Sequence, residues 1–270
     1  MYINISKVDF GRCYSGGSPG GEEYYGMYIT PADASAISVT PYGYYYRLHG
    51  KYLKFSTDGK EWFDLNVRLT IKPGQKMYLK GEDDYVWNSS TNGKLFETDG
   101  YYNVGGDISS LTNEIVDVKD YTFSKLFSND NYIKDASSLI LPANTLASYC
   151  YSWMFFRCYS LTAVPSLTAT TLAEGCYYSM FNGCTSLTTA PELPATTLAG
   201  WCYQNIFYKC SNINNITMLA TDISATNCLN DWVSGVSATG TFTKSPEMTT
   251  LPTGTSGIPE GWTVVDYGAA

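Results

Sequence analysis

The sequence is poor in the residues on which acid-base catalysis and nucleic-acid binding depend. It contains one histidine, His49, and its 17 lysines and arginines are outnumbered by 25 aspartates and glutamates, which gives a formal net charge of −8. A phosphate backbone is bound by clustered cations, so we expect no nucleic-acid partner. His49 lies in the strand-like run YYYRLHGKYLKF, where a structural role is expected. We therefore predict a protein that is not an enzyme and has no catalytic residues.

Long apolar runs are also absent. No apolar stretch approaches the 18 residues that would suggest a membrane-spanning helix. The start, MYINISKVDFGRCYSGG, lacks a basic region followed by an apolar one, as a signal peptide would have. We therefore expect no membrane insertion and a chain that stays in the cytoplasm where it is made, a description that includes virion proteins.

Motifs that hold cofactors or metal ions are missing as well. The glycine-rich segment GGSPGG at 16–21 has neither the GxGxxG spacing nor the following helix-forming run of a phosphate-binding loop. Glu82, Asp83 and Asp84 lack the alternating spacing of a calcium loop, so we expect a solvated turn there. The sequence predicts no cofactor and no metal site.

The residues that are abundant favour β-structure. Tyrosine and glycine occur 24 times each, and charged residues make up only 16% of the chain. Three dipeptides suited to tight turns separate alternating runs: Asp58-Gly59, Asn92-Gly93 and Asp99-Gly100. We expect a small antiparallel β-sandwich over 35–112, preceded by a flexible N-terminal arm over 1–34 that attaches to a partner or is a disordered tail.

The second half of the chain is repetitive. Four gapless units of 26 residues follow one another at 141–166, 167–192, 193–218 and 219–244. The segment 121–140 is similar to a degraded leading unit. Repeats of this length stack into a solenoid because one unit cannot bury its own apolar face. We predict a solenoid over 113–244 and a C-terminal cap over 245–270.

Each unit is expected to contain a short helix and an extended segment. In CYYSMFNGC, the two cysteines and Met180 are spaced at i, i+4 and i+8, which predicts about two helical turns with one buried stripe. The threonine-rich stretch that ends at Pro191 is expected to be a short strand. The predicted fold is thus β-rich and two-domain, a small antiparallel β-sandwich followed by an α/β solenoid.

The paired cysteines are predicted to be buried free thiols. Eight helical residues separate their Cα atoms by about 12 Å, too far for a disulfide within a unit. Disulfides between stacked units and metal binding remain as alternatives, although structural zinc sites pair cysteines at closer spacing. Val236 occupies the second-cysteine position of the last unit, which favours a small apolar side chain there. Cys13 lies outside these rows and is assigned no role.

Large aromatic residues occupy variable positions of the units. Counted from the leading leucine, positions 9, 12, 13 and 16 lie away from the cysteine stripe of the predicted helix. They hold Tyr149, Trp153, Phe156, Tyr178, Trp201 and Tyr208. Such rings predict a ligand-binding surface suited to sugar stacking or a contact between subunits. The third alternative is that tilted helices bury them within the solenoid.

The units resemble a known family. The element M-F-x-x-C-x-S-L at 180–187 is similar to the motif of BspA-like leucine-rich repeats. The run A-P-x-L-P-A-T-T-L-A-x-x-C-Y-x-x-M-F at 190–207, with Ile206 in the methionine place, is similar to a variant found in surface proteins of gut anaerobes and in their phages. The resemblance spans about 121–265, and 55–81 is similar to a β-domain that precedes such repeats.

The resemblance implies a binding scaffold. Together with the missing signal peptide, it predicts a phage virion component, such as a tail-fibre, tail-tip or capsid-fibre protein, that contacts the bacterial host surface. The expected partners are a host receptor or glycan, other virion proteins through the arm, and further copies of this chain in a homo-oligomer. The alternatives are a bacterial cell-surface adhesin and a structural virion decoration protein without a receptor.

Overall fold

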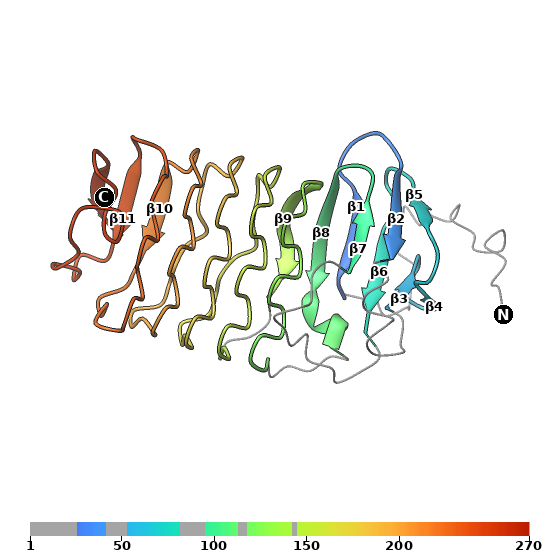
Figure 1. The fold of residues 1–270 in the computed structure, drawn as a ribbon, viewed down its shortest axis with the longest axis horizontal. Helices are drawn as coiled ribbons and strands as arrows, with labels where there is room; N and C mark the ends of the chain where they lie inside the picture. Colours follow the sequence, from blue (N-terminus) through green and yellow to red (C-terminus); the bar gives the residue numbers. More distant parts are fainter. Residues whose placement is uncertain (1–25, 42–52, 82–94, 113–117, 142–144, 270) are drawn as a thin grey trace.

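The protein is an elongated β-rich molecule in which a front domain leads into a stack of coils (Figure 1). The structure is a computed structural model, and it describes residues 26–41, 53–81, 95–112, 118–141 and 145–269. The strands are β1 Tyr28–Pro31, β2 Ile37–Pro41, β3 Lys54–Ser56, β4 Phe63–Asp64, β5 Leu69–Ile71, β6 Met77–Lys80, β7 Phe96–Thr98, β8 Tyr102–Asp107, β9 Ile133–Ile140, β10 Asn215–Met218, β11 Thr241–Lys244 and β12 Thr263–Asp266. The β-rich prediction is confirmed.

The front domain, residues 26–112, contains two sheets. One has the order β4-β3-β6-β1-β8-β9 and the other β5-β2-β7, and the pairs within the front domain are antiparallel. Side chains alternate between buried and partly exposed, as in β6, where Met77 and Leu79 are buried. Phe96 of the small sheet contacts Tyr102 of the large one with ring centroids 5.7 Å apart. The two sheets therefore share one core.

The predicted turns join the strands in two ways. Asp58 and Gly59 close the hairpin between β3 and β4: Gly59 has a φ of 74°, and its backbone N–H donates to Ser56 Oγ. Asp99-Gly100 instead links β7 to β8, which belong to different sheets. The structure thus has a hairpin turn at the first dipeptide, whereas the second lies in a connection between the two sheets. Asn92-Gly93 and His49 lie outside the described residues.

Part of the predicted N-terminal arm belongs to the large sheet. Strand β1 pairs with β6 on one side and with β8 on the other, which makes it an interior strand. Gly26 forms a further bridge with Asp107. The β-structure therefore begins by residue 26 and not at 35, whereas residues 1–25 lie outside the described residues.

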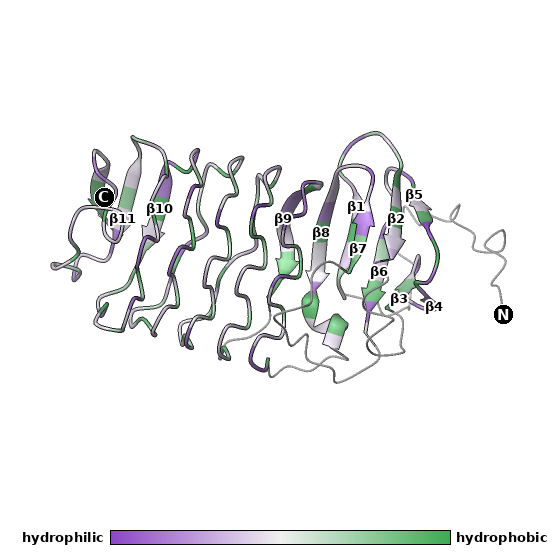
Figure 2. Ribbon diagram, in the orientation of Figure 1, coloured by the Kyte–Doolittle hydropathy of each residue, from purple (hydrophilic) through white to green (hydrophobic). Residues whose placement is uncertain are grey.

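The coil stack, residues 118–266, continues the large sheet. Strand β9 lies in the leading coil and pairs in parallel with β8 of the front domain, so the sheet crosses from one part to the other. We number the 26-residue units coil 1 to coil 4. Strand β10 lies at the end of coil 3 and pairs in parallel with β11, which in turn pairs in parallel with β12. One continuous hydrophobic cluster runs from Met27 to Trp262. Apolar and polar residues are interspersed along both parts (Figure 2).

The prediction of a short helix in each unit is wrong. The described residues contain one 3₁₀ helix, η2 Ile108–Thr112, and no α-helix. Each cysteine-bounded stretch is a run of tight turns, which we call a turn run, with a positive φ at every fourth residue. These residues are Tyr121, Lys125 and Asn129 in the leading coil, Tyr149, Trp153 and Arg157 in coil 1, Gly175, Ser179 and Gly183 in coil 2, Trp201, Asn205 and Lys209 in coil 3, and Asn227, Asp231 and Gly235 in coil 4.

The hydrogen bonds explain why a turn run replaces a helix. Along coil 1 they alternate: Cys150 N–H donates three residues back to Ala147, whereas Tyr151 N–H donates to Cys176 of the next coil. The sequence period is four, and a helix of 3.6 residues per turn would rotate such a stripe by about 40° at each repeat. Turns linked to the neighbouring coil keep the four-residue stripe facing inward.

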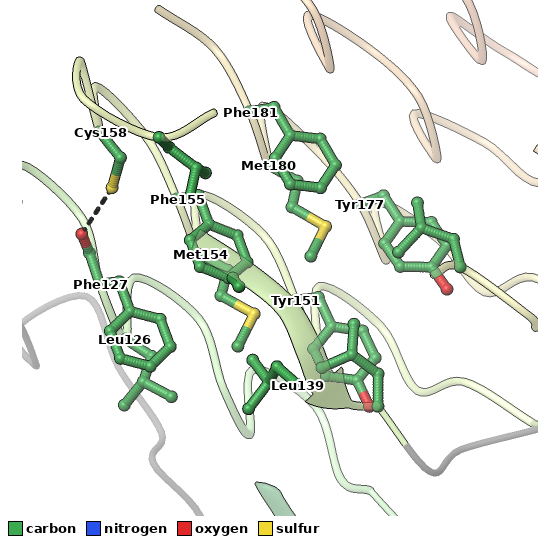
Figure 3. Packing of buried hydrophobic residues seen from close by; sticks show 14 of the residues in the cluster. Leu126, Phe127, Leu139, Tyr151, Met154, Phe155, Cys158, Tyr177, Met180 and Phe181 are labelled. Atoms are coloured by element: carbon green, nitrogen blue, oxygen red, sulfur yellow. Dashed lines mark hydrogen bonds between the residues drawn. The ribbon is translucent and has the colours of Figure 1, made fainter. Parts of the chain in front are cut away.

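Aromatic rows fill the core of the stack. Rings at equivalent positions of successive coils lie nearly parallel, with centroids 5.3 to 6.1 Å apart. One row is Phe123, Tyr151, Tyr177 and Tyr203, and the other is Phe127, Phe155, Phe181 and Phe207. Figure 3 shows parts of both rows with Met154 and Met180 beside them. Because each buried ring contributes about 1.5–3 kcal/mol, these rows are a main source of stability.

Candidate functional site

The cysteines of the stack are buried free thiols, as predicted for the described part of the chain. None of the seven that the structure describes forms a disulfide, and Cys13 lies outside the described residues. In the second-cysteine row each thiol donates to a phenylalanine carbonyl of the preceding coil, as Cys184 Sγ does to Phe155 O at 3.1 Å. Figure 3 shows the equivalent bond from Cys158 to Phe127. The row is therefore held by hydrogen bonds as well as by packing, a role that Val236 cannot fill.

The environment of these thiols suppresses their reactivity. Burial raises the pKa of Cys150 and of Cys210 to about 12. It also raises the pKa values of Cys176, Cys184 and Cys202. The thiolate is the nucleophile and the metal ligand, so these side chains are protonated and inert near neutral pH. Among the described residues, no group of three His, Cys, Asp or Glu side chains could hold a metal ion.

No helix in the part of the chain that the structure describes is long and apolar enough to cross a membrane.

The six predicted binding residues lie on one side of the stack. We call turn side the surface formed by unit positions 9, 12, 13, 16 and 17 of the turn runs. All six are half-buried, in contrast to the cysteine and ring rows behind them: Tyr149, Trp153, Phe156, Tyr178, Trp201 and Tyr208. Each ring therefore keeps part of its surface open to solvent.

Four rings of the turn side form a connected cluster. Tyr121 stacks on Tyr149 with centroids 5.1 Å apart, and Tyr149 lies 6.2 Å from Tyr178. Trp153 meets Tyr178 edge to face at 4.8 Å, and Lys125 Nζ lies 5.3 Å from the centre of the Trp153 ring. The sequence analysis missed Tyr121 and Lys125, because the leading unit is longer than the others. Aligning it on its turn run would have found both.

Two of the three remaining predicted rings lie next to cations. The Arg157 guanidinium lies 4.8 Å from the centre of the Phe156 ring, and Lys209 Nζ lies 5.2 Å from that of Tyr208. Trp201 begins the turn run of coil 3 and donates its backbone N–H to Thr226 of coil 4. The turn side thus presents aromatic faces together with positive charges.

Three of these rings sit on a strained backbone. Tyr149 and Trp153 have a φ of 54° and Trp201 has a φ of 55°. The left-handed region costs a bulky residue about 1 kcal/mol, whereas glycine and asparagine enter it readily. Coil 2 has Gly175 at position 9 and coil 4 has Asn227 there. Residues that adopt the left-handed conformation with little strain therefore occur at the same position of other coils.

A second aromatic pair lies outside the turn side and was not predicted. Tyr101 and Tyr132 are about 40% exposed, and their ring centroids are 5.9 Å apart. Lys134 lies 5.5 Å from the Tyr101 ring and forms an ion pair with Asp33. The two tyrosines come from the front domain and the leading coil, and no sequence repeat links them.

Comparisons of the chain with protein-family models, with curated proteins and with solved structures found no match.

Proposed function

We propose that this is a non-enzymatic binding protein whose turn side holds a ligand. One observation carries the proposal: Tyr149, Trp153 and Trp201 occupy positive-φ positions and remain half-exposed. Strain of this kind points to a function when a relaxed alternative exists, and neighbouring coils provide glycine and asparagine at equivalent positions. Partly exposed rings stack well on sugar faces, because their flat apolar surfaces match the C–H faces of a pyranose.

We also propose that the coil stack is a variant of the BspA-like leucine-rich repeat. The 26-residue period and the M-F-x-x-C-x-S-L element support this assignment. The variant differs from our sequence-based expectation because a turn run takes the place of the helix. Stacked coils present a long repeating surface, which suits the recognition of extended ligands.

The biological setting that we propose is a phage virion component that contacts the surface of a bacterial host. Its support is the resemblance of the repeats to those of gut-anaerobe phages and surface proteins. The partners in this proposal are a host receptor or glycan, other virion proteins through the N-terminal arm, and further copies of this chain. A bacterial adhesin would use the same turn side.

The test is a double substitution that removes two rings without adding strain. Trp153→Asn gives coil 1 the residue that coil 3 already has as Asn205, and Trp201→Asn gives coil 3 the residue that coil 4 has as Asn227. We expect an unchanged or slightly higher melting temperature and lost binding to intact gut-anaerobe cells and to a glycan array. The matched control is Tyr101→Ala with Tyr132→Ala, which removes two exposed rings from another surface.

The other results would assign the rings differently. Lost oligomerisation in light scattering, with unchanged cell binding, would make the turn side a subunit contact. A drop in melting temperature of ten degrees or more would place the rings in the core. Equal loss of binding in the control would show that the turn side is not the specific site.

A further inference from the structure

Across coils 1 to 4 the turn side repeats with a period of two coils, which the leading coil, with Tyr121 at the equivalent of position 9, does not share. Coils 1 and 3 each carry an aromatic residue at position 9, an aromatic residue at position 16 and a cation at position 17. The two sets are Tyr149, Phe156 and Arg157 in coil 1 and Trp201, Tyr208 and Lys209 in coil 3. Coil 2 holds Gly175, Asn182 and Gly183 at these positions, and coil 4 holds Asn227, Ser234 and Gly235.

The small residues of coils 2 and 4 make room for the large ones. A Cβ on Gly175 would overlap the Tyr149 ring, which therefore lies across the backbone of coil 2. A Cβ on Gly183 would lie 3.2 Å from Arg157 Cγ, and one on Gly235 would lie 3.7 Å from Lys209 Cγ. The large residues of coil 1 thus lie over coil 2, and those of coil 3 lie over coil 4. The turn side is divided into two similar subsites, one built on coils 1 and 2 and the other on coils 3 and 4.

Each subsite has an available positive charge. Arg157 and Lys209 are exposed, and neither forms an ion pair with a residue that the structure describes. Each subsite also has one carboxylate, Glu174 on coil 2 and Asp231 at position 13 of coil 4. Glu174 accepts a hydrogen bond from Tyr149 OH at 3.4 Å, and neither carboxylate forms an ion pair with Arg157 or Lys209. In a chain with a net charge of −8, two unpaired cations beside aromatic faces form a local site for an anion.

The spacing of the subsites defines the ligand. Stacked coils lie about 4.8 Å apart, so equivalent residues two coils apart lie about 10 Å apart. This is about the length of two pyranose residues in an extended glycan. We propose that the turn side binds an acidic glycan of disaccharide repeats, with a carboxylate or sulfate on every second sugar. The rings stack on the sugars while Arg157 and Lys209 bind successive anionic groups. This inference rests on the proposed glycan-binding function and adds the chemical class of the ligand.

The test compares three glycans of equal length by calorimetry. A hyaluronan oligosaccharide has a carboxylate on every second sugar, oligogalacturonate has one on every sugar, and a chitin oligosaccharide has none. We expect hyaluronan to bind about tenfold or more tightly than chitin, and to bind more weakly as salt is raised from 50 to 500 mM. Arg157→Gln with Lys209→Gln should remove this preference and the salt dependence. Lys60→Gln with Lys72→Gln removes the same charge from exposed sites of the front domain and should change neither.

A further variant tests the two-coil spacing of the cations. Arg157→Gly with Gly183→Lys exchanges the large and small residues at position 17, where Lys209 of coil 3 already has a positive φ. The exchange moves one cation to the neighbouring coil, next to Lys209, and should shift the preference towards oligogalacturonate. Equal binding of hyaluronan and chitin, with both lost in Trp153→Asn and Trp201→Asn, would overturn the acidic ligand and leave the proposed function standing. Tighter binding of oligogalacturonate than of hyaluronan by the unaltered protein would overturn the two-coil spacing. Binding to cells that depends on the rings, without affinity for any of the three glycans, would overturn the ligand class alone.

Discussion

The front domain and the coil stack bury one common core by two different backbone arrangements. In the front domain side chains alternate with a period of two, and each strand pairs with strands distant in sequence, as β1 does with β6 and β8. In the turn runs of the stack the period is four, and backbone N–H groups of coils 1 to 3 donate to carbonyls 25 residues further along, whereas those of the leading coil donate 27 residues further along. The difference shows that backbone groups of a solenoid can be satisfied without a helix or a long strand, provided that a neighbouring coil lies alongside.

The strongest test of this contrast is to remove one interior strand. Deleting residues 1–34 removes β1 from between β6 and β8. We expect the front domain to lose its cooperative melt, because two sheet edges are left unpaired and Ile29 no longer fills the core. Thermal circular dichroism measures this. The matched deletion of residues 1–25 spares β1 and should keep the melt, and its loss there would show that the preceding segment completes the domain.

Alkaline pH should weaken the stack more than the front domain. All seven described cysteines lie in the stack, and the folded state raises the pKa of six of them by burial. A raised pKa of an acid means that the unfolded chain loses its proton first. Stability is therefore full below the unfolded thiol pKa of about 8.5 and falls above it by about 1.4 kcal/mol per pH unit for each thiol.

Urea denaturation at pH 8 and pH 10 measures this loss, which should amount to several kcal/mol in all. The matched control replaces Cys158, Cys184 and Cys210 by valine and should show a shallower dependence on pH. An equal loss of stability in the control would assign the effect to the buried tyrosines, such as Tyr177 and Tyr203, whose pKa values burial also raises.

Removing one ring from a stacked row should destabilise the coil stack and leave the front domain stable. Phe181 stacks between Phe155 and Phe207, so Phe181→Ala leaves a cavity in the middle of the stack and should cost about 3–5 kcal/mol. Hydrogen exchange should increase in coils 1 to 3 and remain slow in β1, β6 and β8. The reciprocal variant Phe55→Ala creates its cavity in the front domain and should show the reverse distribution. Uniform exchange across both parts in either variant would mean that the shared core unfolds as one unit.

The smallest expected effect distinguishes the two cysteine rows. Cys184 donates to Phe155 O, and a serine hydroxyl could donate there too. Among the described residues no bond from Cys176 Sγ to a carbonyl of the preceding coil is seen, and this sulfur interacts with backbone groups of Ala173 and Tyr177 in its own turn run. Cys184→Ser should therefore cost about 1 kcal/mol less than Cys176→Ser, because only the hydroxyl at position 184 keeps a hydrogen bond that links two coils. Equal midpoints in urea denaturation would indicate that packing alone fixes both rows.

The sequence predicted the repeat better than the local backbone. The 26-residue period and the buried rows follow directly from equivalent residues such as Cys150 and Cys176, because positions that face the core recur in every coil. The turn runs could not be predicted from the sequence, because apolar residues at i, i+4 and i+8 fit a short helix as well as a series of four-residue turns. The distinguishing signal was Gly175 and Gly183, two glycines eight residues apart in the expected helix of coil 2.

The limits of the front-domain prediction have another cause. The turn residues Asp58 and Asp99 are alike in sequence, yet only the first closes a hairpin. Whether a chain returns to the same sheet depends on long-range pairing, which a dipeptide does not encode. The aromatic residues of the turn side could be singled out from the sequence because they occupy positions that vary between units. The pattern of cations beside them becomes visible only when the coils are compared in order.

The regular register of the coils allows the stack to be lengthened by duplication of one unit in the gene. A coil closes on its neighbours at a constant offset, so duplicating the 26 codons of one unit in frame would add a coil and leave every existing junction intact. Such a duplication would lengthen the stack by about 4.8 Å. A copy of coil 2 inserted before coil 3 would spread the two subsites apart, whereas a copied pair of coils would add a third. For the glycan ligand that we propose, the bound length would thus change by recombination alone, without a new residue.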